Sequence, residues 1–140
     1  MGNAPKDYRL TDQVGYNLRR ANQRHVAIFA AHVEGLTPTQ FAALARLFEL
    51  GALSQNHLGR LTAMDSATIK GVVERLAGKG LVSLAADPDD RRLRQVDLTE
   101  KGREVFARAH KGAMAARRDT LEPLSADEAT MFEALLSKLV

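Results

Sequence analysis

Residues 80–102 read GLVSLAADPDDRRLRQVDLTEKG, and the spacing of their apolar residues differs from that of the preceding chain. After Gly80, apolar and polar residues alternate over 81–85 and again over 93–98, which predicts two short β-strands. The residues between the strands, 87–92, are polar and contain Pro88, as is typical of a turn. This stretch therefore predicts a β-hairpin with a charged tip.

The chain on both sides of the hairpin has the three- and four-residue apolar spacing of amphipathic helices. Two capping boxes mark helix starts, one formed by Thr37 with Gln40 and one by Ser125 with Glu128. Pro38 fits the first turn of its helix, because that position needs no amide hydrogen bond. Together with Gly and Pro stop signals, the pattern predicts helices over residues 10–34, 38–50, 55–62, 66–79, 100–121 and 126–139.

The predicted order is helix, helix, short helix, helix, hairpin, helix, helix. This mainly α-helical order with one small β-hairpin wing is that of a winged helix-turn-helix. We therefore expect a single domain over residues 1–140, in which residues 37–99 form the winged helix-turn-helix lobe. The flanking helices, about 10–35 and 100–140, carry longer apolar stripes than this lobe can cover. We expect them to pair as the dimerisation helices of a symmetric homodimer.

Composition restricts the function further. The 140 residues are 45% hydrophobic and 26% charged, and 20 Lys and Arg against 17 Asp and Glu leave a net charge of +3. This mildly basic charge allows nucleic-acid binding without requiring it. The absence of cysteine excludes disulfides, cysteine-ligated zinc and a cysteine nucleophile. No apolar run approaches the roughly 20 residues of a membrane span and no signal peptide is visible, so we expect a cytoplasmic protein without membrane contact.

The sequence gives little support to catalysis. It lacks a Gly-rich phosphate loop, an activated serine motif and a recognisable pair of catalytic carboxylates, so we expect no enzyme and no cofactor. His25 and His32 lie seven residues apart on one predicted helix, whereas metal ligands on a helix usually lie three or four apart. We therefore expect no metal site.

The fourth predicted helix carries candidate DNA-reading residues. Its N-terminal cap is Asp65 or Ser66, and its polar face contains Ser66, Thr68 and Lys70 and extends to Arg75. Short hydroxyls and a cation at a helix N-terminus suit the major groove of DNA. A solvated face on an ordinary helix would have the same composition, and this helix alone favours that interpretation.

The hairpin tip favours DNA binding. Arg91 and Arg92 lie in the predicted turn and Arg94 follows it, and a projecting arginine can enter a narrow minor groove or bind phosphate. Three nearby carboxylates offset the charge of these arginines. Either one carboxylate holds an arginine in a fixed pose, or the tip is a solvated turn. The carboxylates are Asp87, Asp89 and Asp90.

Several motifs resemble those of the MarR-type winged-helix transcriptional regulators, in the same order: LTPTQ at 36–40, GLV at 80–82, DPDDRR at 87–92 and VDLTEKG at 96–102. The resemblance implies a homodimer with interlocking terminal helices that binds a palindromic operator in double-stranded DNA. It also implies that Asp90 orients Arg92, that Arg92 enters the minor groove, and that the polar residues of the fourth helix face the major groove. The predicted DNA contacts are Ser54, Gln55, Ser66, Thr68, Lys70, Arg75, Lys79, Asp90, Arg91, Arg92 and Arg94, of which Ser54, Gln55 and Lys79 are expected at phosphates.

Residues 13–25, QVGYNLRRANQRH, are similar to those of family members that sense aromatic acids or their coenzyme A thioesters. The resemblance implies a pocket between the dimerisation helices and the DNA-binding lobe. Arg19 could neutralise a carboxylate there, and Asn22 or His25 could hydrogen-bond a ring hydroxyl or ring nitrogen. His110 could line the pocket or the interface. Alternatively, Arg19 forms a surface or interface ion pair and His25 is a histidine whose hydrogen bonds are satisfied at the dimer interface.

Two functions are compatible with these patterns. The first is a homodimeric repressor that a small aromatic acid or related ligand releases from its operator. The second is a ligand-independent architectural DNA-binding protein. They differ in one property, because only the regulator loses operator affinity when the acid is added.

Overall fold

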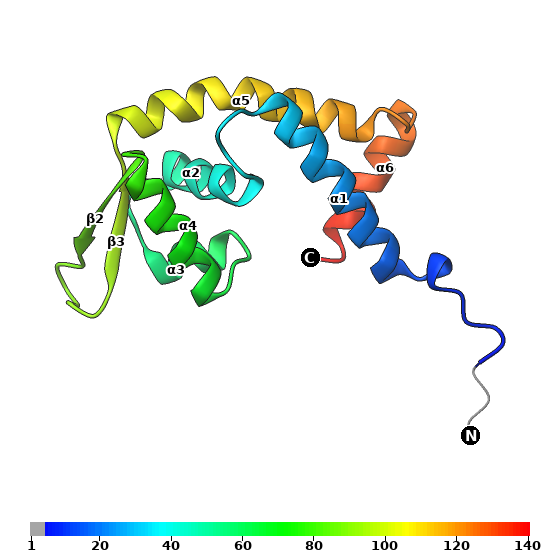
Figure 1. Cartoon of the computed structure of the whole chain (residues 1–140), viewed down its shortest axis with the longest axis horizontal. Helices are drawn as coiled ribbons and strands as arrows, with labels where there is room; N and C mark the ends of the chain where they lie inside the picture. Colours follow the sequence, from blue (N-terminus) through cyan, green and yellow to red (C-terminus); the bar gives the residue numbers. More distant parts are fainter. Residues whose placement is uncertain (1–4) are drawn as a thin grey trace.

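The computed structural model describes residues 5–140, and within that range the chain forms six α-helices, one short 3-10 helix and a three-stranded sheet (Figure 1). The observed order of helices and hairpin confirms the predicted mainly α-helical fold with a β-hairpin wing. The elements are η1 (Leu10–Asp12), α1 (Val14–His32), α2 (Pro38–Leu50), β1 (Leu53–Ser54), α3 (Gln55–Leu61), α4 (Ser66–Gly78), β2 (Val82–Ala86), β3 (Arg94–Leu98), α5 (Glu100–Leu121) and α6 (Ala126–Ser137).

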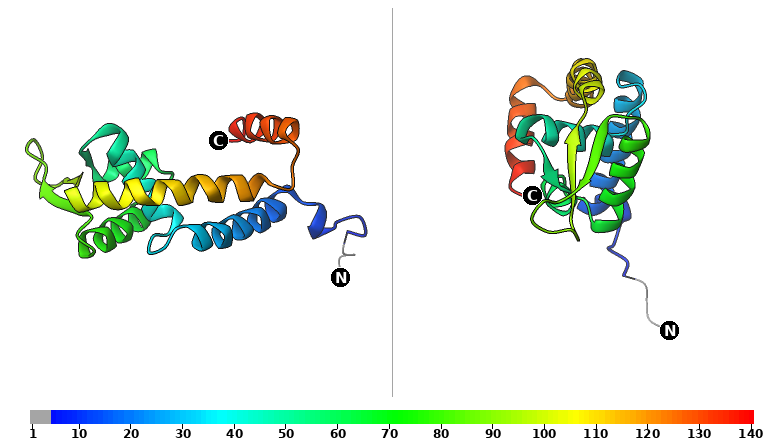
Figure 2. Two further views of the ribbon diagram at one scale, coloured as in Figure 1. Left: turned by 90° about the horizontal axis from the view of Figure 1, so that it is seen from above. Right: turned by 90° about the vertical axis from the view of Figure 1, so that its left-hand side faces the viewer.

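The long helix α5 connects the two halves of the molecule. The lobe formed by α2, α3, α4 and the wing lies beneath one half of α5, and α1 and α6 lie beside its other half (Figure 1). Seen from above, α1 and α4 lie on one side of α5 and α6 lies on the other (Figure 2). Helix α5 therefore links the winged helix-turn-helix lobe to the helices at both ends of the chain.

The wing is the predicted hairpin with one additional strand. β2 and β3 pair antiparallel, with Val82 opposite Leu98, and β1 pairs with the free edge of β3 to give the order β1-β3-β2. Both hairpin strands begin one residue later than predicted, at Val82 and Arg94. β1 is not predictable from the sequence, because its two residues are too few to show an alternating pattern.

The core of the lobe lies between α2, α3, α4 and the sheet. Burying each large apolar side chain contributes about 1.5–3 kcal/mol to folding. These contacts fix the orientation of α4 relative to the wing. The largest fully buried side chains are Leu44, Leu47, Leu58, Ile69, Val73, Leu76 and Val96.

Side chains cap several helices as the sequence predicts. Thr37 and Gln40 form the capping box of α2, with Pro38 in the first turn, and Ser125 and Glu128 form that of α6. The first helix differs from its prediction, because Gln13 has extended backbone angles of φ −85° and ψ 134°. The predicted helix over 10–34 is therefore two elements, η1 and α1.

Helices α1 and α5 approach each other closely at Gly112. A Cβ atom at this position would lie 2.3 Å from the carbonyl oxygen of His32, so only glycine fits without movement of the backbone. We expect Gly112→Ala to lower the free energy of unfolding by about 1–3 kcal/mol, because the two helices must separate. Urea denaturation of both proteins measures this difference.

Gly71→Ala in α4 is the control for this prediction. A Cβ atom at Gly71 would meet nothing within 4 Å, so alanine should stabilise the helix slightly. Equal destabilisation by both substitutions would show that the close approach at Gly112 is not the cause.

Large apolar side chains remain exposed on the helices at the two ends of the chain. Exposed apolar side chains in this number are typical of a protein–protein interface, and they agree with the predicted pairing of these helices. Among the described residues, no helix combines the length and the apolar character needed to cross a membrane. The exposed side chains include Val14 and Leu18 of α1 and Met131, Phe132 and Leu135 of α6.

Candidate DNA-binding and effector sites

The first turn of α4 is fixed by one carboxylate. Oδ1 of Asp65 accepts a hydrogen bond from the backbone N–H of Thr68 at 2.7 Å, so Asp65 rather than Ser66 is the N-cap. This hydrogen bond lowers the pKa of Asp65, which keeps the cap ionised at neutral pH. The other face of α4 is buried in the core, so the helix is held with one side outward.

The outward side of α4 carries the residues predicted to read DNA. The first of them lie at the N-terminal end of the helix, where free backbone N–H groups also favour phosphate. Each of these side chains is exposed to solvent, and their contacts with DNA remain predictions. The exposed residues are Ser66, Thr68, Lys70 and Arg75.

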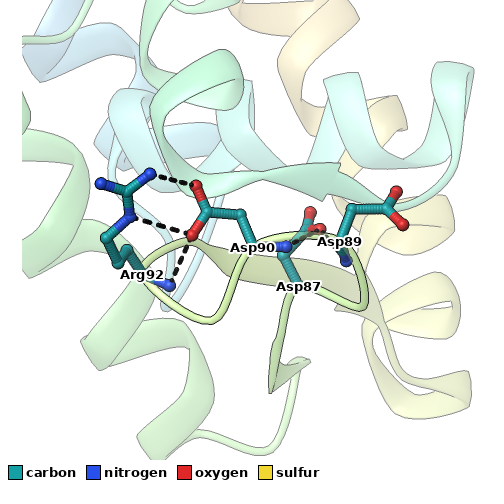
Figure 3. A network of polar contacts seen from close by, with 4 residues as sticks. All are labelled: Asp87, Asp89, Asp90 and Arg92. Atoms are coloured by element: carbon teal, nitrogen blue, oxygen red, sulfur yellow. Dashed lines mark hydrogen bonds and ion pairs between the residues drawn. The ribbon is translucent and has the colours of Figure 1, made fainter.

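At the wing tip, a carboxylate holds an arginine in a fixed pose (Figure 3). The guanidinium of Arg92 donates from Nε to Oδ1 of Asp90 and from Nη2 to Oδ2, both at 3.1 Å. The backbone N–H of Arg92 also donates to Oδ1 of Asp90 at 3.0 Å. These hydrogen bonds, the side-chain ones first, lower the pKa of Asp90. The Arg92 side chain is nevertheless 89% exposed, so it is oriented and still free to contact a partner.

A second carboxylate shapes the turn itself. Oδ1 of Asp87 accepts hydrogen bonds from the backbone N–H groups of Asp89 at 2.8 Å and Asp90 at 3.2 Å. The acids of the tip therefore organise the turn and its arginine, which confirms the first of the two alternatives that the sequence left open. The side chain of Asp89 points away from this network (Figure 3).

The wing is also tied to α4. Nη1 of Arg94 on β3 lies 3.8 Å from Oε1 of Glu74 on α4, so the two predicted DNA-binding elements are joined by an ion pair. Both side chains are about half exposed, and the pair contributes little to stability. The ion pair instead orients the Arg94 side chain. Arg91 is exposed at the wing tip.

The three residues predicted at phosphates have different surroundings. Oγ of Ser54 accepts from the backbone N–H of His57 at 3.2 Å and caps α3. Oε1 of Gln55 is buried and has no hydrogen-bond partner among the described residues. The ammonium of Lys79 donates to the carbonyl of Gly35 at 2.6 Å, which gives it a role within the protein. Their contacts with phosphate remain predictions.

Helix α1 binds the C-terminal end of α5 through polar side chains. The guanidinium of Arg24 donates to the carbonyls of Thr120 at 2.8 Å and Asp119 at 3.0 Å. Nδ1 of His25 lies 2.8 Å from Oγ1 of Thr120, and Nε2 of His32 lies 2.5 Å from Oδ2 of Asp119. His25 therefore has a hydrogen-bond partner within its own chain, and its roles at a ligand or at the dimer interface remain predictions. Nothing in the sequence pointed to Arg24, because its partners lie 95 and 96 residues away.

Aromatic rings form a continuous series next to His25. Neighbouring ring centroids lie 4.8 to 6.3 Å apart along the series. Phe106 is buried in its middle, whereas Phe48 is half exposed. The structure thus brings two predicted ligand residues, His25 and His110, to the ends of one aromatic surface. We call this set the aromatic cluster, and it consists of His25, Phe29, Phe41, Phe48, Phe106 and His110.

The other two predicted ligand residues lie outside this cluster. Arg19 and Asn22 are exposed on α1, nearer its N-terminal end. Within the described residues Arg19 has no carboxylate partner, so the predicted ion pair is not formed inside one chain. Their contact with a ligand remains a prediction.

Known proteins resemble this chain over nearly its whole length. Residues 36–93 match the MarR family. The HTH-type transcriptional repressor NicR of Pseudomonas putida is 41% identical, over 98% of this chain and 90% of its own. The crystal structure of a probable transcriptional regulator from Pseudomonas aeruginosa is 52% identical, with a TM-score of 0.90 over 94% of this chain and 100% of its own.

A third relative is described together with a ligand. The structure of BpsR from Bordetella bronchiseptica, whose DNA binding is regulated by 6-hydroxynicotinic acid, is 38% identical. Its TM-score is 0.88, and the match covers 97% of both chains. The named relatives are regulators of transcription, and their similarity extends across the lobe and the terminal helices.

Proposed function

This chain belongs to the MarR family of DNA-binding transcriptional regulators, and we propose that it is a homodimeric repressor released from a palindromic operator by a small aromatic or heteroaromatic acid. The observation that carries the proposal is the wing, where Asp90 orients an exposed Arg92 next to the exposed polar face of α4. We further propose that the protein acts in the cytoplasm, without enzymatic activity.

Two copies of the chain would place two such surfaces on one duplex. The exposed apolar side chains of α1 and α6 provide the surface through which the copies pair. In the dimer, each α4 enters a major groove and each Arg92 a neighbouring minor groove. Twofold symmetry then requires half-sites about one helical turn, roughly 34 Å, apart.

The aromatic cluster supports the choice of effector. An aromatic ligand can pack against its rings, and the imidazoles of His25 and His110 offer hydrogen bonds at either end. Arg19, on the same helix as His25, supplies the cation that a carboxylate requires. The ligand of BpsR, a heteroaromatic acid with a ring hydroxyl, has this chemistry.

The wild-type protein tests the proposal directly. Fluorescence anisotropy with labelled DNA from the protein's own upstream region measures operator affinity with and without 6-hydroxynicotinic acid. We expect the acid to weaken binding by about tenfold or more, which corresponds to a coupling free energy within the usual 1–3 kcal/mol.

The matched control ligand is 6-hydroxynicotinamide, which lacks the carboxylate and should have little effect. If no aromatic acid changes operator affinity, the chain is a ligand-independent architectural DNA-binding protein. Equal effects of acid and amide would contradict the assigned role of a cation in the site.

A further inference from the structure

A groove with a volume of about 630 Å³ lies at the C-terminal end of α4, and Lys79 is the residue that it shares with the predicted DNA contacts. It is formed by the C-terminal end of α1, the loop after it, the end of α4 and the first half of α5. These are the elements on the α1 and α4 side of α5 in Figure 2. A groove of this size can hold a small organic molecule.

The groove and the aromatic cluster use different faces of α5. Lys101, Val105 and Arg108 line the groove, whereas Phe106 and His110 belong to the cluster. At 3.6 residues per turn, the two sets point roughly 150° apart around the helix. A ligand in the groove is therefore separate from an aromatic acid at the cluster.

Cations dominate the polar lining. Lys79, Lys101 and Arg108 line the groove, with Glu34 as the acid among the lining residues. Among the described residues, none of these three cations lies within 4.0 Å of a carboxylate oxygen. The fourth basic group, His32, is already bound to Asp119. The groove thus has an excess of positive charge that the protein does not neutralise.

Neutral oxygens hold the two lysines in place. The ammonium of Lys79 donates to the carbonyl of Gly35 at 2.6 Å and to Oε1 of the buried Gln40 at 3.3 Å. The ammonium of Lys101 donates to the carbonyl of Lys79 at 3.0 Å. These hydrogen bonds orient the ammonium groups without removing their charge, so the groove is preorganised for an anion.

The remaining lining is apolar. Val33, Leu36 and Leu81 are buried side chains at the groove, and Val105 and Ala109 are partly buried there. An inorganic anion would use the cations and leave this surface in water. An anion attached to an apolar group would use both parts of the lining.

Helix capping and DNA binding account for these cations less well than a small anion does. Hydrogen bonds to carbonyl oxygens account for the positions of Lys79 and Lys101, but they explain neither Arg108 nor the gathering of three cations in one groove. DNA phosphate is a poor occupant, because the groove lies at the C-terminal end of α4. The DNA-reading end of α4 is about 20 Å away along the 13-residue helix.

We propose that this groove is a second small-molecule site, which binds an organic dianion with an apolar group, such as an aryl or acyl phosphate. The bound anion contacts the lobe through Lys79 and the long helix through Lys101 and Arg108. Because it bridges these parts, its binding changes operator affinity, and DNA binding changes the affinity of the groove equally. This regulatory consequence rests on the proposed function, whereas the anion site itself does not.

Isothermal titration calorimetry of the full-length protein with phenyl phosphate tests the site. We expect one molecule bound per protomer, with inorganic phosphate at least about tenfold weaker because it lacks the apolar group. The double variant Lys101→Gln with Arg108→Gln should weaken phenyl phosphate by about tenfold or more, through the loss of two charged contacts. Excess 6-hydroxynicotinic acid should not displace phenyl phosphate.

The matched control is Arg103→Gln with Lys111→Gln, which removes the same charge from exposed positions of α5 outside the groove. The proposal is overturned by the absence of saturable binding, by unchanged affinity in the groove variant, or by an equal loss in the control. Displacement by 6-hydroxynicotinic acid would overturn the independence of the two sites.

Operator binding measured with and without phenyl phosphate tests the regulatory consequence. We expect its Kd to change by about fivefold or more in the wild type and to stay unchanged in the groove variant. Calorimetric binding without any change in Kd would overturn this consequence alone. If no aromatic acid releases the DNA, the proposed function fails, but the calorimetric test of the anion site is unaffected.

Discussion

Arg92→Ala is expected to weaken operator binding by about 1–3 kcal/mol, a factor of about 5 to 150 in Kd. The guanidinium is presented at the wing tip by two hydrogen bonds to Asp90 and is otherwise exposed. Its orientation is therefore fixed before DNA binds, and alanine removes both the charge and the contact. Fluorescence anisotropy at two salt concentrations measures the loss and the change in salt dependence.

Asp90→Asn separates the two contributions of this pair. The variant keeps the Arg92 charge but weakens the hydrogen bonds that orient its guanidinium. We therefore expect a smaller loss of operator affinity than that caused by Arg92→Ala. Arg118→Ala, at an exposed position of α5, controls for net charge. If Arg92→Ala binds the operator as tightly as the wild type, the wing does not enter the groove.

Arg19→Ala is expected to abolish release by an aromatic acid while leaving operator affinity unchanged. Arg19 is exposed and has no carboxylate partner within the described chain, so its charge is available to a ligand carboxylate. Losing a charged hydrogen bond of about 1.5–3 kcal/mol raises the acid concentration needed for release by about tenfold or more, so a concentration that just releases the wild type no longer releases the variant. Operator release titrated with 6-hydroxynicotinic acid measures this shift.

Arg20→Ala provides the matched control on the same helix. The Arg20 guanidinium lies over the ring of Tyr16, 5.8 Å from its centroid. Helical periodicity places Arg20 on the side of α1 away from the predicted ligand face. Its removal should leave release unchanged. A normal response of Arg19→Ala, or the same shift in both variants, would show that the carboxylate is bound elsewhere.

Local signals made most of the fold predictable. The capping boxes at Thr37 and Ser125 lie within four residues of chain, so the sequence contains all the groups that form them. The same holds for Asp90 and Arg92, which lie only two positions apart in the sequence. Where the structure adds to the predictions, the interaction joins distant segments. β1 exists only because β3 pairs with it.

The candidate sites show the same limit. Arg24 meets the end of α5 across 95 residues, and the cationic groove gathers side chains from α1, α4 and α5. No periodicity or motif encodes such distances, since they depend on how the helices pack. Conversely, resemblance to related regulators points to Arg19, which the structure places at an exposed position of α1.

The close approach at Gly112 has a mechanical consequence for regulation. The backbones of α1 and α5 touch there, and polar contacts from Arg24, His25 and His32 fasten the far end of α5 to α1. The two helices therefore form one rigid body within each subunit. We expect release from DNA to involve rotation of these rigid bodies about the twofold axis, or bending where α5 joins the wing. Sliding of α1 along α5 is disfavoured.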